Sequence, residues 1–205
     1  MKRKAKIFEF NSLTSDNIEF IADALESGSV AVLPTDSVYG LVVCSSAKNA
    51  LNKLNQIKNN PSGKLPQVLC DKETAYALVC ANANFDKIAK LWPSALTVIA
   101  KTSSQGAKLL GGSNTIGLRV PDDDLILSLI KKIGRPFFAS SANKHGEPVC
   151  SDRTAISNVF KNTADIIVLK DSIGTKSSAI IDISAFTPVV IRGGFLAEKA
   201  LNLLR

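Results

Sequence analysis

The sequence of 205 residues predicts an α/β fold in which helices flank a twisted, mixed β-sheet. Segments with apolar residues at helical spacing alternate with short β-branched runs, which favours this class. Late in the chain, short apolar runs follow one another with little helical sequence between them, which favours some antiparallel pairing. With 45% apolar and 21% charged residues, the chain can bury one sizeable core. We therefore expect a single domain over residues 1–205.

The first elements follow from capping residues and periodicity. Residues 6–10 read as a strand, and Asp16 can cap the amphipathic helix that follows. The run 29–33 is β-branched and stops at a proline, so we predict a buried strand there. Ser46 is a candidate cap for a second amphipathic helix, which ends at Lys58.

The remaining elements are predicted in the same way. Further strands are expected at residues 67–70, 96–100, 115–119, 136–140, 165–169, 178–183 and 188–192. Further helices are expected near residues 72–80, 84–92, 122–133 and 152–160, and from Leu196 to the end. Three aspartates at 122–124 precede an apolar helical segment and are most simply its N-terminal cap.

Composition limits the classes of function. The net charge of +7 is compatible with a polyanionic partner, although a basic solvated surface explains it equally well. The four cysteines lack the spacing of a zinc site or a disulfide framework. The apolar runs are too short for a membrane helix, and residues 6–10 take the place of a signal-peptide apolar region. We therefore expect a cytoplasmic protein without a membrane span.

Polar groups follow several of the predicted strands, where ligands of α/β sheets gather. Residues 34–41 carry hydroxyls, a carboxylate and a phenol, although an ordinary turn has the same composition. Residues 57–66 hold two lysines that suit a phosphate chain, although a solvated helix end also favours lysine. Segments 117–121, 140–143 and 190–194 add arginines and small polar groups. A common polar cleft explains these recurrences better than chance does.

Taken in order, these segments resemble the YrdC family, also called TsaC, from about residue 10 to 195. The resemblance rests on ordered motifs, which are Pro34 to Leu41, Lys58 to Pro61, Trp92 to Thr97, Arg119 to Pro121, Ser141 to Asn143 and Arg192-Gly193. It implies a short, single-domain threonylcarbamoyl-AMP synthase with a basic concave face.

The implied reaction joins L-threonine, bicarbonate or CO2, and ATP into threonylcarbamoyl-adenylate and releases pyrophosphate. Mg²⁺ is the implied cofactor, entering with ATP; no residues are assigned to a metal. The implied partners are the proteins that transfer the threonylcarbamoyl group to tRNA. Binding of tRNA or double-stranded RNA to this chain is a further implied possibility. Catalysis in this family is positioning without a covalent enzyme nucleophile.

The resemblance also assigns roles to individual residues. The residues implied to bind threonine are Thr35, Ser37, Tyr39, Arg119, Ser141 and Ser178. The residues implied to bind ATP are Lys58, Asn60, Lys64, Thr115, Asn143, Ser151 and Arg192. Lys58, Arg119 and Arg192 are implied to position the reacting groups.

Two alternatives stay open at this stage. One is a catalytically weak RNA-binding module of the same fold. The other is a domain that makes related carbamoyl-adenylate chemistry for another acceptor, which the absence of acylphosphatase-like or zinc-finger segments in this sequence disfavours.

Asn60 is the departure from the family pattern that matters most, because an arginine is usual there. If residues 57–66 bind phosphate, Asn60→Arg adds a charge-assisted contact of roughly 1.5–3 kcal/mol. We therefore expect pyrophosphate release to rise about tenfold or more. An unchanged rate and an unchanged ATP affinity would contradict the assignment of this loop.

Overall fold

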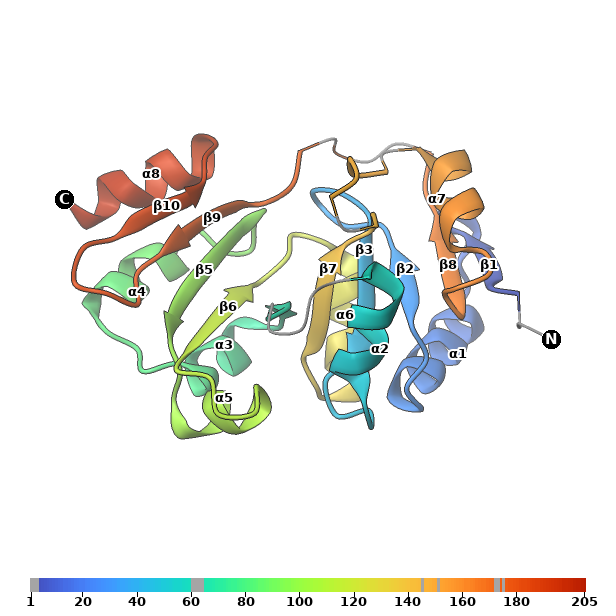
Figure 1. Cartoon of the computed structure of the whole chain (residues 1–205), viewed down its shortest axis with the longest axis horizontal. Helices are drawn as coiled ribbons and strands as arrows, with labels where there is room; N and C mark the ends of the chain where they lie inside the picture. The colour runs from blue at the N-terminus through green and yellow to red at the C-terminus, as the bar shows by residue number, and fades with distance from the viewer. Residues whose placement is uncertain (1–3, 60–64, 145, 151, 172–173, 175) are drawn as a thin grey trace. The chain divides into compact units, whose positions relative to one another are not determined.

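The computed structural model describes most of the chain, and its described residues form two compact units. Unit 1 combines Met1–Pro66 with Asp123–Ser177, and unit 2 combines Gln67–Asp122 with Ser178–Arg205. The described residues are 4–59, 65–144, 146–150, 152–171, 174 and 176–205. Each unit contains strands in both directions and helices packed on them (Figure 1).

Unit 1 is built on strands in the order β1-β8-β2-β3-β7. Their bounds are β1 Lys6–Glu9, β8 Ile166–Leu169, β2 Ala31–Leu33, β3 Gly40–Cys44 and β7 Phe137–Ser141. β8 runs parallel to β1 and β2, whereas β3 is antiparallel to both of its neighbours, β2 and β7. The residues of β3 are all buried, and so are those of β2.

Helices cover these strands. They are the 3₁₀ turn η1 Phe10–Ser12 and the helices α1 Ser15–Glu26, α2 Ala50–Lys58, α6 Asp124–Ile133 and α7 Arg153–Phe160. α2 packs on β3 and β7, α7 packs on β8, and α1 contacts both β3 and α6 (Figure 1). Because α2 ends beside β7, its last residue, Lys58, is held close to the end of that strand.

Unit 2 is built on strands in the order β4-β6-β5-β9-β10. Their bounds are β4 Gln67–Leu69, β6 Thr115–Arg119, β5 Leu96–Lys101, β9 Ala179–Asp182 and β10 Val189–Arg192. The pairs β4–β6 and β5–β9 are parallel, and β5–β6 and β9–β10 are antiparallel. The helices are α3 Lys72–Leu78, α4 Ala83–Ala89, α5 Ser104–Leu109 and α8 Phe195–Leu204.

One face of the unit 2 sheet is apolar and the other is largely polar. Ile116 and Leu118 are buried, whereas Thr115 and Gly117, which alternate with them along β6, are half-buried. The same alternation gives a buried Ile181 beside a half-buried Asp182. Side chains two residues apart share a face of a sheet. We call the face that carries Thr115, Gly117 and Asp182 the polar face of unit 2.

The predicted α/β class with a mixed sheet flanked by helices is confirmed, including antiparallel pairing late in the chain at β9–β10. The single-domain extent and the basic concave face stay predictions. Among the described residues, no helix combines the length and apolar character needed to cross a bilayer.

Several local predictions are corrected. Thr14, not Asp16, caps α1, because Thr14 has the extended backbone of a cap and exchanges side-chain bonds with Asn17. α2 begins at Ala50 after a left-handed Asn49, so Ser46 is not its cap. The strand β3 and the short helix α5 were not predicted. β3 lacks alternation because it is wholly buried.

The predicted aspartate cap of α6 is confirmed, since the Asp123 carboxylate accepts a hydrogen bond from the Ile126 N–H at 3.0 Å. Burial raises the pKa of Asp123, more than that hydrogen bond lowers it. The folded protein therefore binds this proton more tightly than the unfolded chain does. The ionised carboxylate reduces stability above the folded pKa, and this cost disappears below the unfolded pKa.

We expect Asp123→Asn, which keeps the cap, to raise the free energy of unfolding at pH 7 and to lose that advantage by pH 3. Urea unfolding at both pH values measures the difference. The matched control is Asp152→Asn, which changes an exposed cap bonded to the Ala155 N–H at 2.8 Å and should show no gain at pH 7. A gain for Asp123→Asn that is equal at both pH values would contradict the burial argument.

Candidate functional site

The connection from β2 to β3 is a compact turn of buried hydroxyls. The Thr35 hydroxyl donates to the Val38 carbonyl at 2.7 Å and accepts from the Ser37 N–H at 3.0 Å. The Thr35 and Ser37 hydroxyl oxygens lie 3.1 Å apart. Because the single proton of Thr35 is directed at Val38, this turn fixes the orientation of the Thr35 hydroxyl.

Strand pairing brings this turn to a second polar segment. In the antiparallel pair β3–β7, Gly40 lies opposite Ser141. The Ala142 N–H continues the ladder by donating to the Tyr39 carbonyl at 2.7 Å. The beginning of one strand therefore meets the end of the other. The Thr35–Tyr39 turn and the Ser141–Asn143 segment consequently lie at the same end of unit 1.

Lys58 joins the second segment from the C-terminus of α2, where the helix dipole favours a cation. Its ammonium group donates to the Ser141 carbonyl at 2.7 Å and to Asn143 Oδ1 at 2.9 Å. The Ser141 hydroxyl also donates to Asn143 Oδ1, at 2.7 Å. The Lys58 side chain is only 5% exposed. A buried cation therefore lies among the oxygens of residues that the sequence assigned to threonine and ATP.

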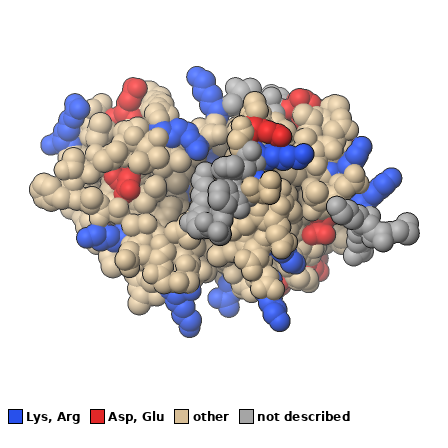
Figure 2. All heavy atoms as spheres, in the orientation of Figure 1, with Lys and Arg blue, Asp and Glu red and all other residues tan. Residues whose placement is uncertain are grey.

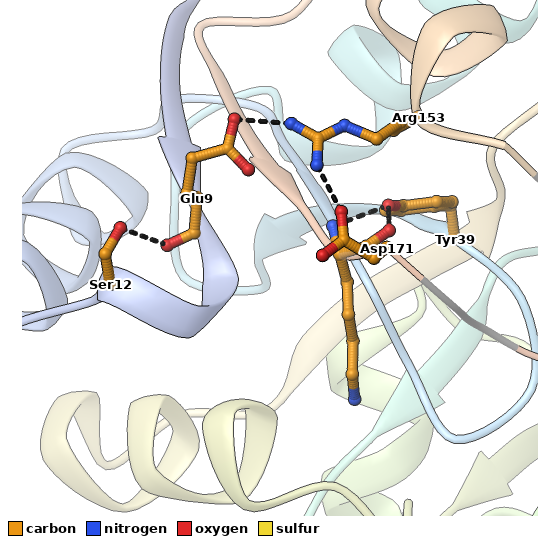
Figure 3. Close-up of polar contacts among 6 residues, drawn as sticks. Glu9, Ser12, Tyr39, Arg153 and Asp171 are labelled. Carbon is orange, nitrogen blue, oxygen red and sulfur yellow. Dashed lines mark hydrogen bonds and ion pairs between the residues drawn. The ribbon is translucent and has the colours of Figure 1, made fainter.

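The Tyr39 hydroxyl has a structural partner. It donates to the Lys170 carbonyl and accepts from the Lys170 N–H, both at 2.8 Å. Next to it, Arg153 contacts Glu9 at 2.6 Å and also Asp171 (Figure 3). These contacts tie the segment after β8 to β1, α7 and the Tyr39 end of the turn. Burial raises the pKa of Tyr39, so its phenol remains protonated at neutral pH.

The segment after β8 also meets the turn at Ser37. A Cβ atom added to Gly174 would lie 2.1 Å from the Ser37 carbonyl oxygen, which no side chain tolerates. Gly174 is therefore required for this close approach. The turn is held at Tyr39 by hydrogen bonds, and at Ser37 it lies too close to Gly174 to admit a side chain there.

The polar face of unit 2 gathers the other predicted residues. Arg119 lies two residues beyond Gly117 on β6, and Arg192 lies opposite Ile180 in the β9–β10 register. Arg192 Nη1 donates to the Ser178 carbonyl at 3.0 Å. The Ser178 and Thr97 hydroxyl oxygens lie 2.9 Å apart. Arg119, Thr97 and Ser178 are all buried.

The predicted residues thus fall into two groups. Unit 1 brings together Lys58, Ser141 and Asn143, and separately pairs Thr35 with Ser37 at the same end of the sheet. In unit 2, the alternation of β6 places Thr115 and Arg119 on the polar face, where Ser178 and Arg192 are in contact. Asn60, Lys64 and Ser151 lie outside the described residues. A common pocket for both groups stays a prediction.

Sequence reasoning missed two residues of the polar face. Thr97 bonds to Ser178, and Gln67 Nε2 donates to Thr97 Oγ1 at 2.9 Å. Thr97 closes the motif that begins at Trp92, and that position is the signal that could have identified it. Gln67 carried no such signal, because its role depends on the pairing of β4 with β6.

Comparisons with known proteins agree with this architecture. A family model named Sua5_yciO_yrdC, described as "Telomere recombination", matches residues 23–194. The chain is 29% identical to YciO of Escherichia coli (strain K12) over 178 residues, covering 84% of this chain and 86% of that protein. It is 27% identical to a threonylcarbamoyl-AMP synthase of Pyrococcus abyssi over 199 residues, covering 92% and 58%.

A solved structure shares the fold. The crystal structure of P. abyssi Sua5 complexed with L-threonine matches with a TM-score of 0.84 at 24% identity, covering 96% of this chain and 61% of that one.

Tyr39→Phe should reduce the free energy of unfolding by roughly 1–3 kcal/mol, because it leaves the Lys170 N–H and carbonyl without their partner. Urea unfolding measures this change. Tyr76→Phe is the matched control: its hydroxyl bonds to Asp86 in an exposed position, so we expect a loss of less than about 0.5 kcal/mol. Equal losses in the two variants would show that the Lys170 contacts are not specifically stabilising.

Proposed function

Because the chain belongs to the Sua5/YciO/YrdC family, we propose that it is a threonylcarbamoyl-AMP synthase. It makes threonylcarbamoyl-adenylate from L-threonine, bicarbonate or CO2, and ATP, and releases pyrophosphate. The product supplies the proteins that transfer the threonylcarbamoyl group to adenosine in tRNA. Relatives that carry the name threonylcarbamoyl-AMP synthase, at 26–28% identity over 87% or more of this chain, support this proposal.

The observation that carries the proposal is the cluster of Lys58, Ser141 and Asn143. A buried ammonium group held by fixed oxygen atoms is preorganised, and preorganised charges stabilise negative charge that develops in a transition state. Phosphoryl-group chemistry needs such positioning more than it needs a protein nucleophile. In this proposal Lys58 binds the phosphates of ATP. The hydroxyls of Thr35 and Ser37, at the same end of unit 1, bind the amino acid.

The proposed reaction balances without a covalent enzyme intermediate. The amine of threonine attacks bicarbonate or CO2 and forms an N-carboxylate. With bicarbonate this step releases water, and with CO2 it releases the amine proton to solvent. An oxygen of the N-carboxylate then attacks the α-phosphorus of ATP. The bond from that phosphorus to the bridging oxygen breaks, and pyrophosphate leaves with its electron pair. The residues of the chain bind and orient these groups.

Mg²⁺ is proposed only as the counter-ion of ATP. The described residues contain no group of three or more His, Cys, Asp or Glu side chains that could hold a metal ion. In this proposal Mg²⁺ would enter bound to the phosphates and would supply charge neutralisation there.

The net charge of +7 favours a second candidate, an RNA-binding module of the same fold. On the face drawn in Figure 2, the described lysines and arginines are scattered, and some of them lie beside acidic side chains. Counterion release is strongest where cations cluster along a phosphate backbone. The displayed surface therefore lends this candidate less support than the Lys58 cluster lends to the enzyme.

The proposed function predicts that pyrophosphate is released from ATP only when L-threonine and bicarbonate are both present. Lys58→Met should lower the rate about 100-fold, the scale of removing one preorganised electrostatic contact. Lys53→Met, in the same helix, removes a bond to the Gly28 carbonyl and should retain the wild-type rate. Release that does not depend on threonine, or tight salt-dependent RNA binding without ATP binding, would contradict the synthase assignment.

A further inference from the structure

The polar face of unit 2 contains a chain of three hydrogen-bonding side chains. Gln67 Nε2 donates to Thr97 Oγ1 at 2.9 Å, and Thr97 Oγ1 lies 2.9 Å from Ser178 Oγ. These side chains come from β4, β5 and the residue before β9. Thr97 and Ser178 are each 4% exposed. The two hydroxyls are therefore buried, whereas Gln67 is half-buried, and the hydrogen bonds of the hydroxyls can be counted.

The proton count leaves one hydroxyl proton without an acceptor. Each of the two hydroxyls has one proton, and the amide nitrogen of Gln67 can only donate. Within the part of the chain that the structure describes, the only acceptor for either proton is the other hydroxyl. One hydroxyl therefore donates to its partner, and the second proton is left over. A buried donor without an acceptor costs roughly 1–3 kcal/mol.

The direction of the hydrogen bonds from Gln67 to Ser178 assigns the proton without an acceptor to the Ser178 hydroxyl. If Ser178 donated to Thr97, Thr97 Oγ1 would accept two bonds, and its own proton would be left within the sheet between Gln67 and Ser178. If Thr97 donates to Ser178, each link runs in one direction from Gln67 to Ser178. Hydrogen bonds aligned in this way polarise and strengthen one another. The Ser178 hydroxyl then has a proton to donate at the end of the chain.

The charged groups around Ser178 indicate which kind of ligand atom accepts its hydroxyl proton. The Arg192 guanidinium lies 3.0 Å from the Ser178 carbonyl oxygen, and Arg119 lies on the same face of the sheet. An O–H donor next to guanidinium groups favours a negatively charged oxygen, because charge-assisted hydrogen bonds are the strong ones. Carboxylate and phosphate oxygens both have this chemistry.

We propose that Thr97 and Gln67 are positioning residues that fix the Ser178 hydroxyl as a proton donor to a carboxylate or phosphate oxygen of the ligand. The choice of L-threonine and ATP as the ligands to test rests on the proposed function. The carboxylate of L-threonine and the phosphates of ATP are the two sources that the experiment separates.

The test compares the isosteric variant Thr97→Val with the conservative variant Thr97→Ser. Calorimetry measures the Kd of L-threonine and of ATP separately. We expect Thr97→Val to weaken one of these ligands about tenfold, the scale of one hydrogen bond to a charged group, and to leave the other within about twofold. Thr97→Ser should restore the affinity, because it keeps the hydroxyl. If the Kd of L-threonine rises, the anionic oxygen belongs to its carboxylate. If the Kd of ATP rises, the anionic oxygen belongs to a phosphate.

Thr102→Val is the matched control. Thr102 lies just beyond β5, and its hydroxyl donates to the Ser113 carbonyl at 2.8 Å, away from Ser178. This variant loses a threonine hydroxyl in the same unit and should leave both affinities unchanged. The proposal is overturned if Thr97→Val binds both ligands like the wild type, if it weakens both ligands alike, or if Thr97→Ser fails to restore binding.

A second measurement keeps this test separate from the proposed function. If the wild-type protein binds neither L-threonine nor ATP, the synthase assignment fails, but the anion site can still be examined with inorganic phosphate and acetate. At constant ionic strength set with chloride, one of these anions should raise the unfolding temperature of the wild type and of Thr97→Ser more than that of Thr97→Val. Equal shifts in all three proteins would overturn the proposal.

Discussion

The antiparallel pairing of β3 with β7 is the constraint on which the candidate site in unit 1 depends. The register that places Gly40 opposite Ser141 makes the start of one strand coincide with the end of the other. Two segments separated by about half the chain therefore meet without a long connection between them. A shift of one residue in this register would turn every side chain of β3 to the opposite face. The complete burial of β3 makes such a shift costly, so packing stabilises the site geometry.

The rest of unit 1 reinforces this pairing. Lys58 links the end of α2 to the end of β7 through oxygen atoms of Ser141 and Asn143. Tyr39 links the other strand to the segment after β8, and Arg153 ties that segment to β1. The exposed ion pairs of Arg153 contribute little to stability by themselves. Their effect is to restrict the position of a segment that also carries Gly174 against Ser37.

In unit 2 the organising rule is the alternation of side chains along each strand. The buried face is packed against helices, and the opposite face can then carry arginines and hydroxyls without disturbing the core. The Sua5/YciO/YrdC family membership and the proposed synthase activity fit such a division, because a sheet face can position several polar groups along a rigid surface. The buried hydroxyls of Thr97 and Ser178 lie where this rule places them, two residues from half-buried neighbours on β5 and β9.

The sequence by itself determined the fold class, most strands and helices, the Asp123 cap and the family, because these depend on local periodicity, capping chemistry and ordered motifs. It did not reveal β3, whose buried residues have no alternation, or the cap of α1, which is Thr14 and not the predicted Asp16. Only the tertiary structure decided that Lys58 contacts Ser141 and Asn143, that the Tyr39 hydroxyl is engaged by Lys170, and that Gln67 joins Thr97. Each of these contacts depends on strand order and register, which bring together residues whose local sequences contain no information about one another.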